Sequence, residues 1–95
     1  MTKYKSDLIA DLRDPEYAAG YVAAAATESQ EAFLLALRDV AQAREGMAKL
    51  AEGADVNREN LYRMLSEDGN PRLDSLFSVL DALDLRISVE SAERH

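Results

Sequence analysis

The sequence predicts an all-α fold of five helices, followed by a short β-strand at residues 85–90. Two patterns lead to this prediction. Apolar residues recur at intervals of three and four along most of the chain, the spacing of helices that bury one face. Capping residues and proline stand where these periodic segments begin. With 95 residues, of which 47% are hydrophobic, we expect one domain over residues 1–95 with a modest core.

The first predicted helix covers residues 15–27. Asp14 is a good N-cap, and Pro15 suits the first helical position, where its missing N–H costs nothing. Tyr17 and Tyr21 are four residues apart and give this helix an aromatic face that can pack on a neighbour. This segment is therefore expected to be an N-terminal helix that flanks the core.

Two further helices are predicted before residue 56. Ser29 can cap the second helix, whose apolar positions are Phe33, Leu34, Leu37, Val40 and Ala41. Gly46 is expected to break the chain after Arg44. A short third helix then follows, with an apolar face formed by Met47, Leu50, Ala51 and Ala54.

The fourth and fifth helices lie on either side of a turn-rich loop. Asn57 is a suitable N-cap for a helix that reaches about Leu65. The fifth helix starts near Leu73, and its expected apolar stripe is Leu73, Leu76, Phe77, Leu80 and Leu83. In the following segment, 85–90, apolar and polar residues alternate as in a half-buried strand. A single strand must pair with another copy, pair with another protein, or fray.

Residues 47–65, within a core expected at 44–84, have the spacing of a DNA-reading helix-turn-helix. The motif needs a small residue where the two helices cross, and Ala51 stands there. Positions at which the helices would bury each other hold Ala54, Val56, Leu61 and Met64. At the turn, where a left-handed backbone is usual, Asp55 tolerates that conformation better than most residues.

Polar side chains of the second helix in this pair are the candidates for contact with bases. They are Asn57, Arg58, Glu59, Asn60, Tyr62 and Arg63. Arg63 is the best candidate for a bidentate contact with guanine, because its guanidinium fork matches O6 and N7. Phosphate contacts are expected from the flanking Lys49, Arg44 and Arg72. Each residue also has a structural alternative: Asn57 as a cap, Tyr62 as a core edge, and the charged residues as a solvated face with a Glu59–Arg63 pair.

The net charge of −7 argues against simple attraction to DNA. Residues 44–73, however, contain five basic and six acidic residues, and so are the least acidic part of the chain. Residues 1–43 and 74–95 each carry a net charge of −3. A locally positive face remains possible, and the acidic ends would suit a basic protein partner.

Catalytic, metal-binding and membrane roles find no support in the sequence. The chain contains no cysteine, and its single histidine, His95, is terminal and reads as a tag remnant or a frayed end. No phosphate-binding loop or nucleophile motif is present. Residues 1–14 contain no apolar run of the length found in signals or membrane spans. We therefore expect a cytoplasmic protein that is not an enzyme and has no cofactor or metal.

Three segments carry a family resemblance: Gly46–Ala51, Val56–Arg63 and Leu65–Arg72, the last with its Gly-Asn-Pro element. Together they resemble the probable addiction module antidote family, which is similar to HigA-type antitoxins with a Cro or lambda-repressor-like helix-turn-helix. The likeness covers roughly residues 12–85. The resemblance implies an antitoxin of a type II pair that neutralises a RelE- or HigB-like mRNA-cleaving toxin and represses its own operon.

Three functions remain open at this point: an antitoxin that is also an autorepressor, a stand-alone repressor, and a helical interaction module that does not bind DNA. A DNA-binding form is expected to be a homodimer on a palindromic operator, since one recognition helix reads only a half-site. A toxin is expected to bind outside the helix-turn-helix, at Tyr17, Tyr21 or the edge formed by residues 85–89.

Overall fold

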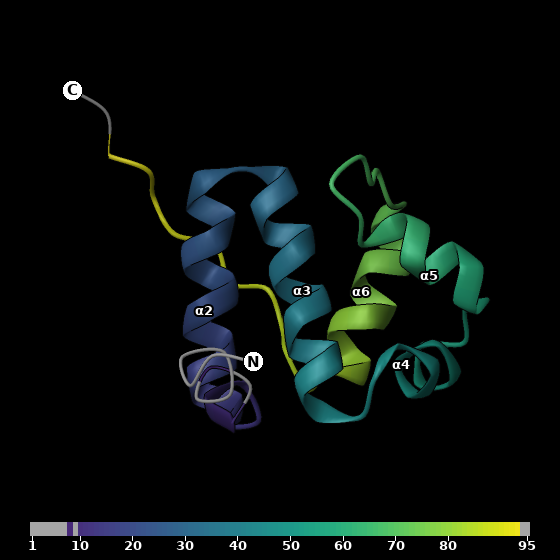
Figure 1. The fold of residues 1–95 in the computed structure, drawn as a ribbon. Helices are drawn as coiled ribbons and strands as arrows, with labels where there is room; N and C mark the ends of the chain where they lie inside the picture. Colours follow the sequence, from purple (N-terminus) through teal and green to yellow (C-terminus); the bar gives the residue numbers. More distant parts are fainter. Residues whose placement is uncertain (1–7, 9, 94–95) are drawn as a thin grey trace.

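The computed structural model describes residue 8 and residues 10–93, and this part of the chain is mainly helical. A short helical segment that includes residues 10–12 comes first, so the described part of the chain has one helix more than the five predicted. The other helices are α2 (Pro15–Glu28), α3 (Gln30–Arg44), α4 (Met47–Gly53), α5 (Arg58–Met64) and α6 (Leu73–Ala82) (Figure 1). All five predicted helices are confirmed, and each begins next to the cap or chain break that predicted it. His95 lies outside the described residues.

Helices α2 and α3 form an antiparallel hairpin around a single linking residue (Figure 1). Ser29 is in extended conformation; its N–H donates to Ala25 at the end of α2, and its side chain accepts from the N–H of Ala32 at the start of α3. One serine therefore ends one helix and caps the next. Across the hairpin, the hydroxyl of Tyr21 donates to a carboxylate oxygen of Asp39 at 2.6 Å.

Helix α3 supplies the centre of the core. Leu37 and Val40 have no exposed surface, and helices α4 and α6 complete the other side of the same cluster. The other buried apolar residues of the helices from α3 onward are Leu34, Ala36, Ala41, Ala43, Met47, Leu50, Ala51, Leu61, Val79 and Leu80. Helix α5 joins this cluster through Leu61, which is fully buried. The core thus extends from the hairpin to the α4–α5 pair.

Residues 10–12, which lie outside every predicted helix, are helical and precede α2. Leu12 is only 1% exposed and belongs to the main core. The segment is tied to α3 by Arg13, whose Nε donates to the carbonyl of Ala43 at 2.9 Å. Leu8 and Leu12 stand four residues apart, which is a helical spacing, but the core role of Leu12 was missed because so short a run, with the charged Asp11 and Arg13 beside Leu12, does not distinguish a helix.

Two members of the stripe predicted for α6 are not in the core. Leu73 is 66% exposed and Phe77 is 52% exposed, whereas Leu80 and Leu83 are buried as predicted. The buried side of α6 is centred on Val79, which has no exposed surface. The prediction failed for the first two residues because the core covers only one side of α6, and they lie at the edge of that side.

The predicted strand at residues 85–90 is absent: the structure has no strand in any described residue. The backbone N–H of Leu85 donates to the carbonyl of Leu80, and the backbone of residues 86–93 makes no hydrogen bond to described residues. This tail runs along the hairpin and then leaves it (Figure 1). A strand needs a neighbouring strand to satisfy its backbone, and the described chain offers none.

Helices α4 and α6 both end in a Schellman motif with aspartate at the left-handed position. At the end of α4, Asp55 has φ 56°, and the N–H of Val56 donates to the carbonyl of Ala51. The left-handed turn expected at Asp55 is thus confirmed. Asp84 has φ 60° and occupies the matching position after α6, where no left-handed turn was predicted.

Arg44 joins the end of α3 to the end of α6. Its guanidinium donates to the carbonyl oxygen of Leu83 and to a carboxylate oxygen of Asp84, the latter at 3.1 Å. The Leu83 carbonyl belongs to the last turn of α6, where carbonyl groups lack helical partners. Arg44 therefore closes the C-terminus of α6 against the hairpin.

The loop between α5 and α6 depends on Gly69. A side-chain carbon at this position would lie 2.1 Å from the carbonyl oxygen of Met64. The carbonyl of Gly69 accepts a hydrogen bond from the side chain of Gln30 at 3.1 Å, which ties the loop to the start of α3. Glycine is required here by the close approach of two backbone segments.

A pair of glycine substitutions tests this packing. Gly69→Ala is expected to lower the free energy of unfolding by about 1–3 kcal/mol, because the added carbon must displace backbone. Gly20→Ala is expected to raise it by about 0.5–1 kcal/mol, since Gly20 lies within α2 with nothing near its missing side chain. Urea denaturation followed by circular dichroism measures both. Equal effects of the two substitutions would contradict the role assigned to Gly69.

The Arg44 contact gives a second stability test. Arg44→Ala should lower the free energy of unfolding by about 1–2 kcal/mol, since a charge-assisted hydrogen bond to a helix-terminal carbonyl is lost. The matched control is Arg58→Ala, which removes an exposed arginine and should change the stability by less than about 0.5 kcal/mol. Thermal and urea denaturation compare the two variants. The assignment fails if both are as stable as the parent protein.

Candidate nucleic-acid interface

Helix α5 presents nearly all of its polar residues to solvent. Leu61 is fully buried. The six side chains predicted to contact bases are all exposed: Asn57, Arg58, Glu59, Asn60, Tyr62 and Arg63. The α5 helix packs on α4, and it stands at the right-hand edge of the molecule in Figure 1. The structure therefore brings the six candidate base contacts together on one exposed helix.

Asn57 is engaged as the N-cap of α5. Its side-chain oxygen accepts from the N–H groups of Glu59, at 2.8 Å, and Asn60, at 3.3 Å. Such a cap stabilises a helix by about 1 kcal/mol. The structural alternative weighed for Asn57 is thus realised, and its oxygen is committed to the helix start.

The side chains of Arg63 and Asn60 are joined by a hydrogen bond. An Arg63 guanidinium nitrogen donates to the amide oxygen of Asn60 at 3.2 Å. Among the described residues Glu59 makes no ion pair, so the Glu59–Arg63 pair considered as an alternative is not formed. The hydrogen bond ties the Arg63 guanidinium to Asn60, and both side chains are exposed on α5.

Tyr62 is held partly against α3. Tyr62 as a whole is 38% exposed, and the guanidinium carbon of Arg38 lies 5.2 Å from the ring centroid, within the range of a cation–π contact. Arg38 was missed as a member of this site because it precedes Tyr62 by more than one helix, and only the fold brings the two together. Tyr62 is therefore exposed on α5 and contacts α3 through Arg38, without belonging to the core cluster.

The three expected phosphate contacts have different environments. Lys49 is exposed on α4. Arg44, with a side chain 27% exposed, is committed to Leu83 and Asp84, so it serves the fold. Both polar contacts of Arg72 are to the carboxylate of Asp74, at 3.1 and 3.3 Å, and this guanidinium holds the pKa of that carboxyl below its ordinary value. Of the three, only Lys49 makes no hydrogen bond or ion pair with the described residues, and it lines a depression with Arg44 and Asp84 rather than with residues of α5.

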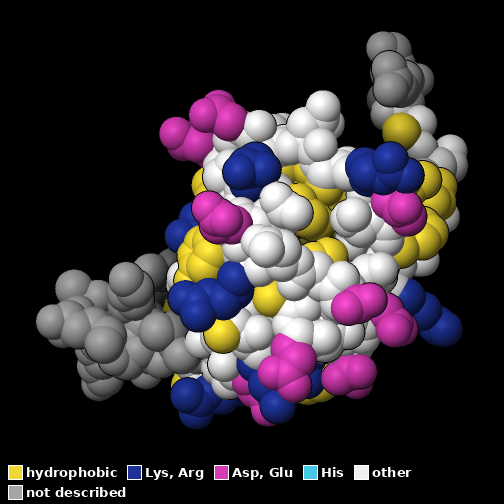
Figure 2. Space-filling model, turned by 90° about the vertical axis from the view of Figure 1, so that its right-hand side faces the viewer, with side chains coloured by type: hydrophobic (Ala, Val, Ile, Leu, Met, Phe, Trp, Pro, Cys, Tyr) yellow, Lys and Arg dark blue, Asp and Glu magenta, His cyan; other side chains and the backbone are white. Residues whose placement is uncertain are grey.

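The electrostatic character of this surface is mixed. Residues 47–65 contain three basic and three acidic residues. The face that includes α5 shows Lys and Arg interspersed with Asp and Glu, without a continuous basic patch (Figure 2). Any attraction to phosphate would therefore come from individual arginine and lysine side chains, and it would be weakened strongly by salt.

Two other kinds of site are absent from the described residues. None of the helices in this part of the chain is long and apolar enough to cross a membrane. No cluster of three or more histidine, cysteine, aspartate or glutamate residues there could hold a metal ion. The exposed face of α5 is accordingly the candidate site.

Comparison with known proteins gives the family. The sequence matches the family described as "Probable addiction module antidote protein" over residues 2–91. An uncharacterised protein of Haemophilus influenzae is 40% identical over 62 residues, which cover 65% of this chain and 63% of that protein, so the match spans less than two thirds of its length. No solved structure matches the sequence. The chain belongs to the family of probable addiction module antidote proteins.

Proposed function

We propose that this protein is the antitoxin of a type II toxin–antitoxin pair and that it represses its own operon by binding DNA through a helix-turn-helix formed by α4 and α5. The observation that carries the DNA-binding part is the exposure of the polar face of α5 opposite the buried Leu61. The left-handed turn at Asp55 supports it, because it joins the two helices with only a short connection.

In this proposal α5 enters the major groove and its exposed side chains read base edges. Arg63 contacts guanine, with Asn60 holding the guanidinium in place at 3.2 Å. Arg58 contacts a second base or a phosphate, and Lys49 contacts phosphate from α4. Arg72 and Arg44 are left out of the contact set because Asp74 and Asp84 already neutralise them.

Membership of an antidote family implies a toxin partner. We propose that this toxin is a RelE- or HigB-like mRNA-cleaving enzyme, whose RNA-binding surface would be basic. The acidic segments 1–43 and 74–95, each with net charge −3, suit such a surface. The proposed role requires no catalytic group, cofactor or metal on the antitoxin.

An apolar groove offers the toxin a binding surface away from α5. It has a volume of about 930 Å³ and lies between α2, α3, α6 and the tail, with Phe33, Leu76 and Ile87 in its lining. Tyr17 is 44% exposed on α2, whereas Tyr21 is half-buried and bonded to Asp39. Of the two tyrosines, Tyr17 is therefore the better anchor for a partner.

Two alternative functions each share only one part of this proposal. A stand-alone repressor would use α5 and have no toxin. A helical interaction module without DNA binding is favoured by one observation, the equal number of acidic and basic residues in 47–65. The next two experiments separate these alternatives from the main proposal.

DNA binding is tested by substitutions on α5 and near it. Arg63→Ala should weaken binding to the upstream region of its own gene by about 1–3 kcal/mol and relax one base position, because a bidentate contact is lost. Lys49→Ala should weaken all sequences alike and reduce the salt dependence. Arg72→Ala is the matched control and should leave affinity nearly unchanged. Mobility shifts at low salt measure all three.

An absence of binding by the parent protein at low salt would overturn the repressor part of the proposal and favour the interaction module. An effect of Arg72→Ala as large as that of Arg63→Ala would overturn the contact set and leave DNA binding itself in place.

The toxin-binding surface is tested by co-expression with the neighbouring gene. Tyr17→Ala and removal of residues 85–95 are expected to weaken copurification and the rescue of growth, since the first removes an exposed aromatic anchor of α2 outside the groove lining and the second removes Ile87 from that lining. Arg63→Ala should leave both unchanged, because α5 is outside that surface. If Arg63→Ala alone abolishes rescue, the toxin binds at α5 and this part of the proposal is wrong.

A further inference from the structure

Arg38 of α3 contacts α5 with the face of its guanidinium group and keeps its N–H groups unused. The guanidinium carbon lies 5.2 Å from the ring centroid of Tyr62, and the side chain makes no hydrogen bond or ion pair with the described residues. In this part of the chain no buried side-chain nitrogen lacks a hydrogen-bond partner. The nitrogens of Arg38 must therefore reach solvent, although the residue as a whole is half-buried.

Arginines that serve this fold use their N–H groups within it. Arg13 donates to the carbonyl of Ala43, and Arg44 donates to the end of α6. Arg38 instead rests on an aromatic ring, and a guanidinium that stacks in this way still has its N–H groups in the plane, directed away from the ring. Such a group can donate two parallel hydrogen bonds to an anion without leaving the ring.

The ring of Tyr62 has an arginine on each side. Arg38 lies over it from α3, and Arg58 stands one helical turn earlier on α5. Two carboxylates follow these arginines in the sequence, and neither cancels them. Asp39 accepts a hydrogen bond from α2, and Glu59 makes no ion pair with the described residues. This surface therefore suits an anionic partner, and it would repel a basic toxin.

The place of Arg38 beside α5 favours contact with the DNA backbone rather than with bases. The major groove is about 12 Å wide, and a helix with its side chains is about 10–12 Å across, so α5 alone fills the groove. A side chain that reaches the flank of α5 from a neighbouring helix then meets the phosphates that border the groove. Arg38 reaches that flank, because it lies over the ring of Tyr62.

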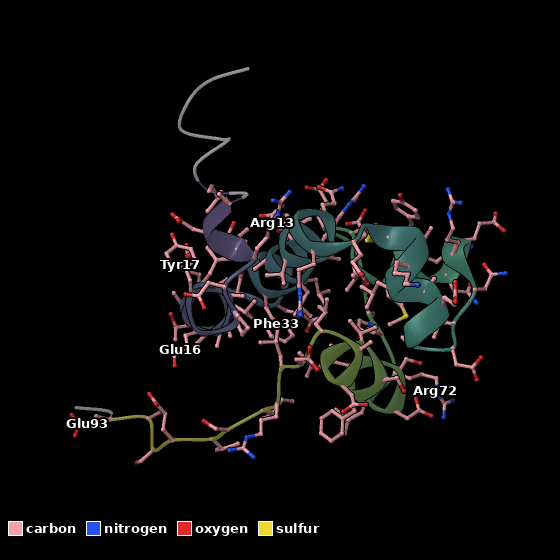
Figure 3. All side chains as sticks on the ribbon, turned by 90° about the horizontal axis from the view of Figure 1, so that it is seen from below. Arg13, Glu16, Tyr17, Phe33, Arg72 and Glu93 are labelled. Carbon is pink, nitrogen blue, oxygen red and sulfur yellow. The ribbon has the colours of Figure 1, made fainter. Side chains whose placement is uncertain are left out.

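We propose that Arg38 is a phosphate contact of the DNA-binding surface, supplied by α3 from outside the helix-turn-helix, and that Tyr62 is the platform that holds its guanidinium. The inference rests on the proposed DNA binding by α5. It gives Tyr62 a positioning role in place of base reading. The surface proposed for the toxin stays separate, since Tyr17 and Glu16 of α2 lie on the opposite side of the molecule from α5 (Figure 3).

Titration of the full chain with the upstream DNA of its own gene, and with an unrelated duplex of equal length, tests the phosphate contact. Arg38→Ala should weaken binding to both by the same factor, about tenfold at low salt. It should also reduce the slope of log affinity against log salt concentration by about 0.9, the value for one phosphate. An unchanged slope would overturn the proposal.

The matched control for this titration is Arg72→Ala. It removes the same charge from an exposed arginine whose guanidinium is already bound to Asp74. The slope and the affinity should both stay close to those of the parent protein. A loss as large as that of Arg38→Ala would mean that only the net charge matters, and the specific contact would be wrong.

Two substitutions of Tyr62 test the platform. Tyr62→Phe keeps the ring and should keep the affinity, whereas Tyr62→Leu removes the π-face and should weaken binding. In the Arg38→Ala background, Tyr62→Leu should have little further effect, because the platform has nothing left to hold. Both side chains reach the surface, so these variants should remain folded, which circular dichroism checks. Additive effects of the two substitutions would overturn the platform role.

The outcomes separate this inference from the proposed function. A parent protein that binds no DNA at low salt overturns the repressor function and this contact together. A parent protein that binds DNA with a salt slope indifferent to Arg38→Ala overturns the contact alone. If Arg38→Ala leaves DNA binding unchanged and abolishes copurification with the toxin, Arg38 belongs to a protein interface and the proposal is wrong.

Discussion

Burial of one side of α5 is the constraint on which the rest of the structure depends. Leu61 and Leu65 are both fully buried and belong to the same cluster as Leu37 and Val40 of α3. A seven-residue helix would not persist alone in water, so this packing is what maintains it. The exposure of its polar residues follows directly, because fixing Leu61 inward leaves the opposite side facing solvent.

The ends of the helices are fixed by a small number of polar contacts rather than by further apolar burial. Ser29 and Asn57 satisfy N-terminal N–H groups, and Arg44 satisfies a carbonyl at the end of α6. In the described residues no buried side-chain polar atom lacks a partner. Arg13 and Arg44 serve the fold in this way, whereas Arg58 is exposed on α5 and makes no hydrogen bond or ion pair with the described residues.

The proposed DNA binding depends on individual exposed basic side chains, because the net charge is acidic and the face that includes α5 has no continuous basic patch. Asp74 and Asp84 neutralise Arg72 and Arg44, both away from α5. Arg63 instead bonds a neutral amide, so its positive charge is not cancelled by its partner. In the proposed function, specificity would then come from few directed contacts, with weak non-specific attraction to DNA. The acidic remainder of the surface would serve a protein partner.

The sequence alone determined the five helices, the cap at Asn57 and the left-handed turn at Asp55, because capping, periodicity and turn preference act within a few residues. It also singled out the side chains of α5 that are exposed. Only the tertiary structure decided that Arg44 binds Leu83, that Arg38 stacks on Tyr62, and that Leu73 and Phe77 stay outside the core. The prediction of a strand at residues 85–90 failed for the same reason. Strand pairing, ring stacking and burial depend on residues far away in the chain, and a local sequence pattern carries no information about them.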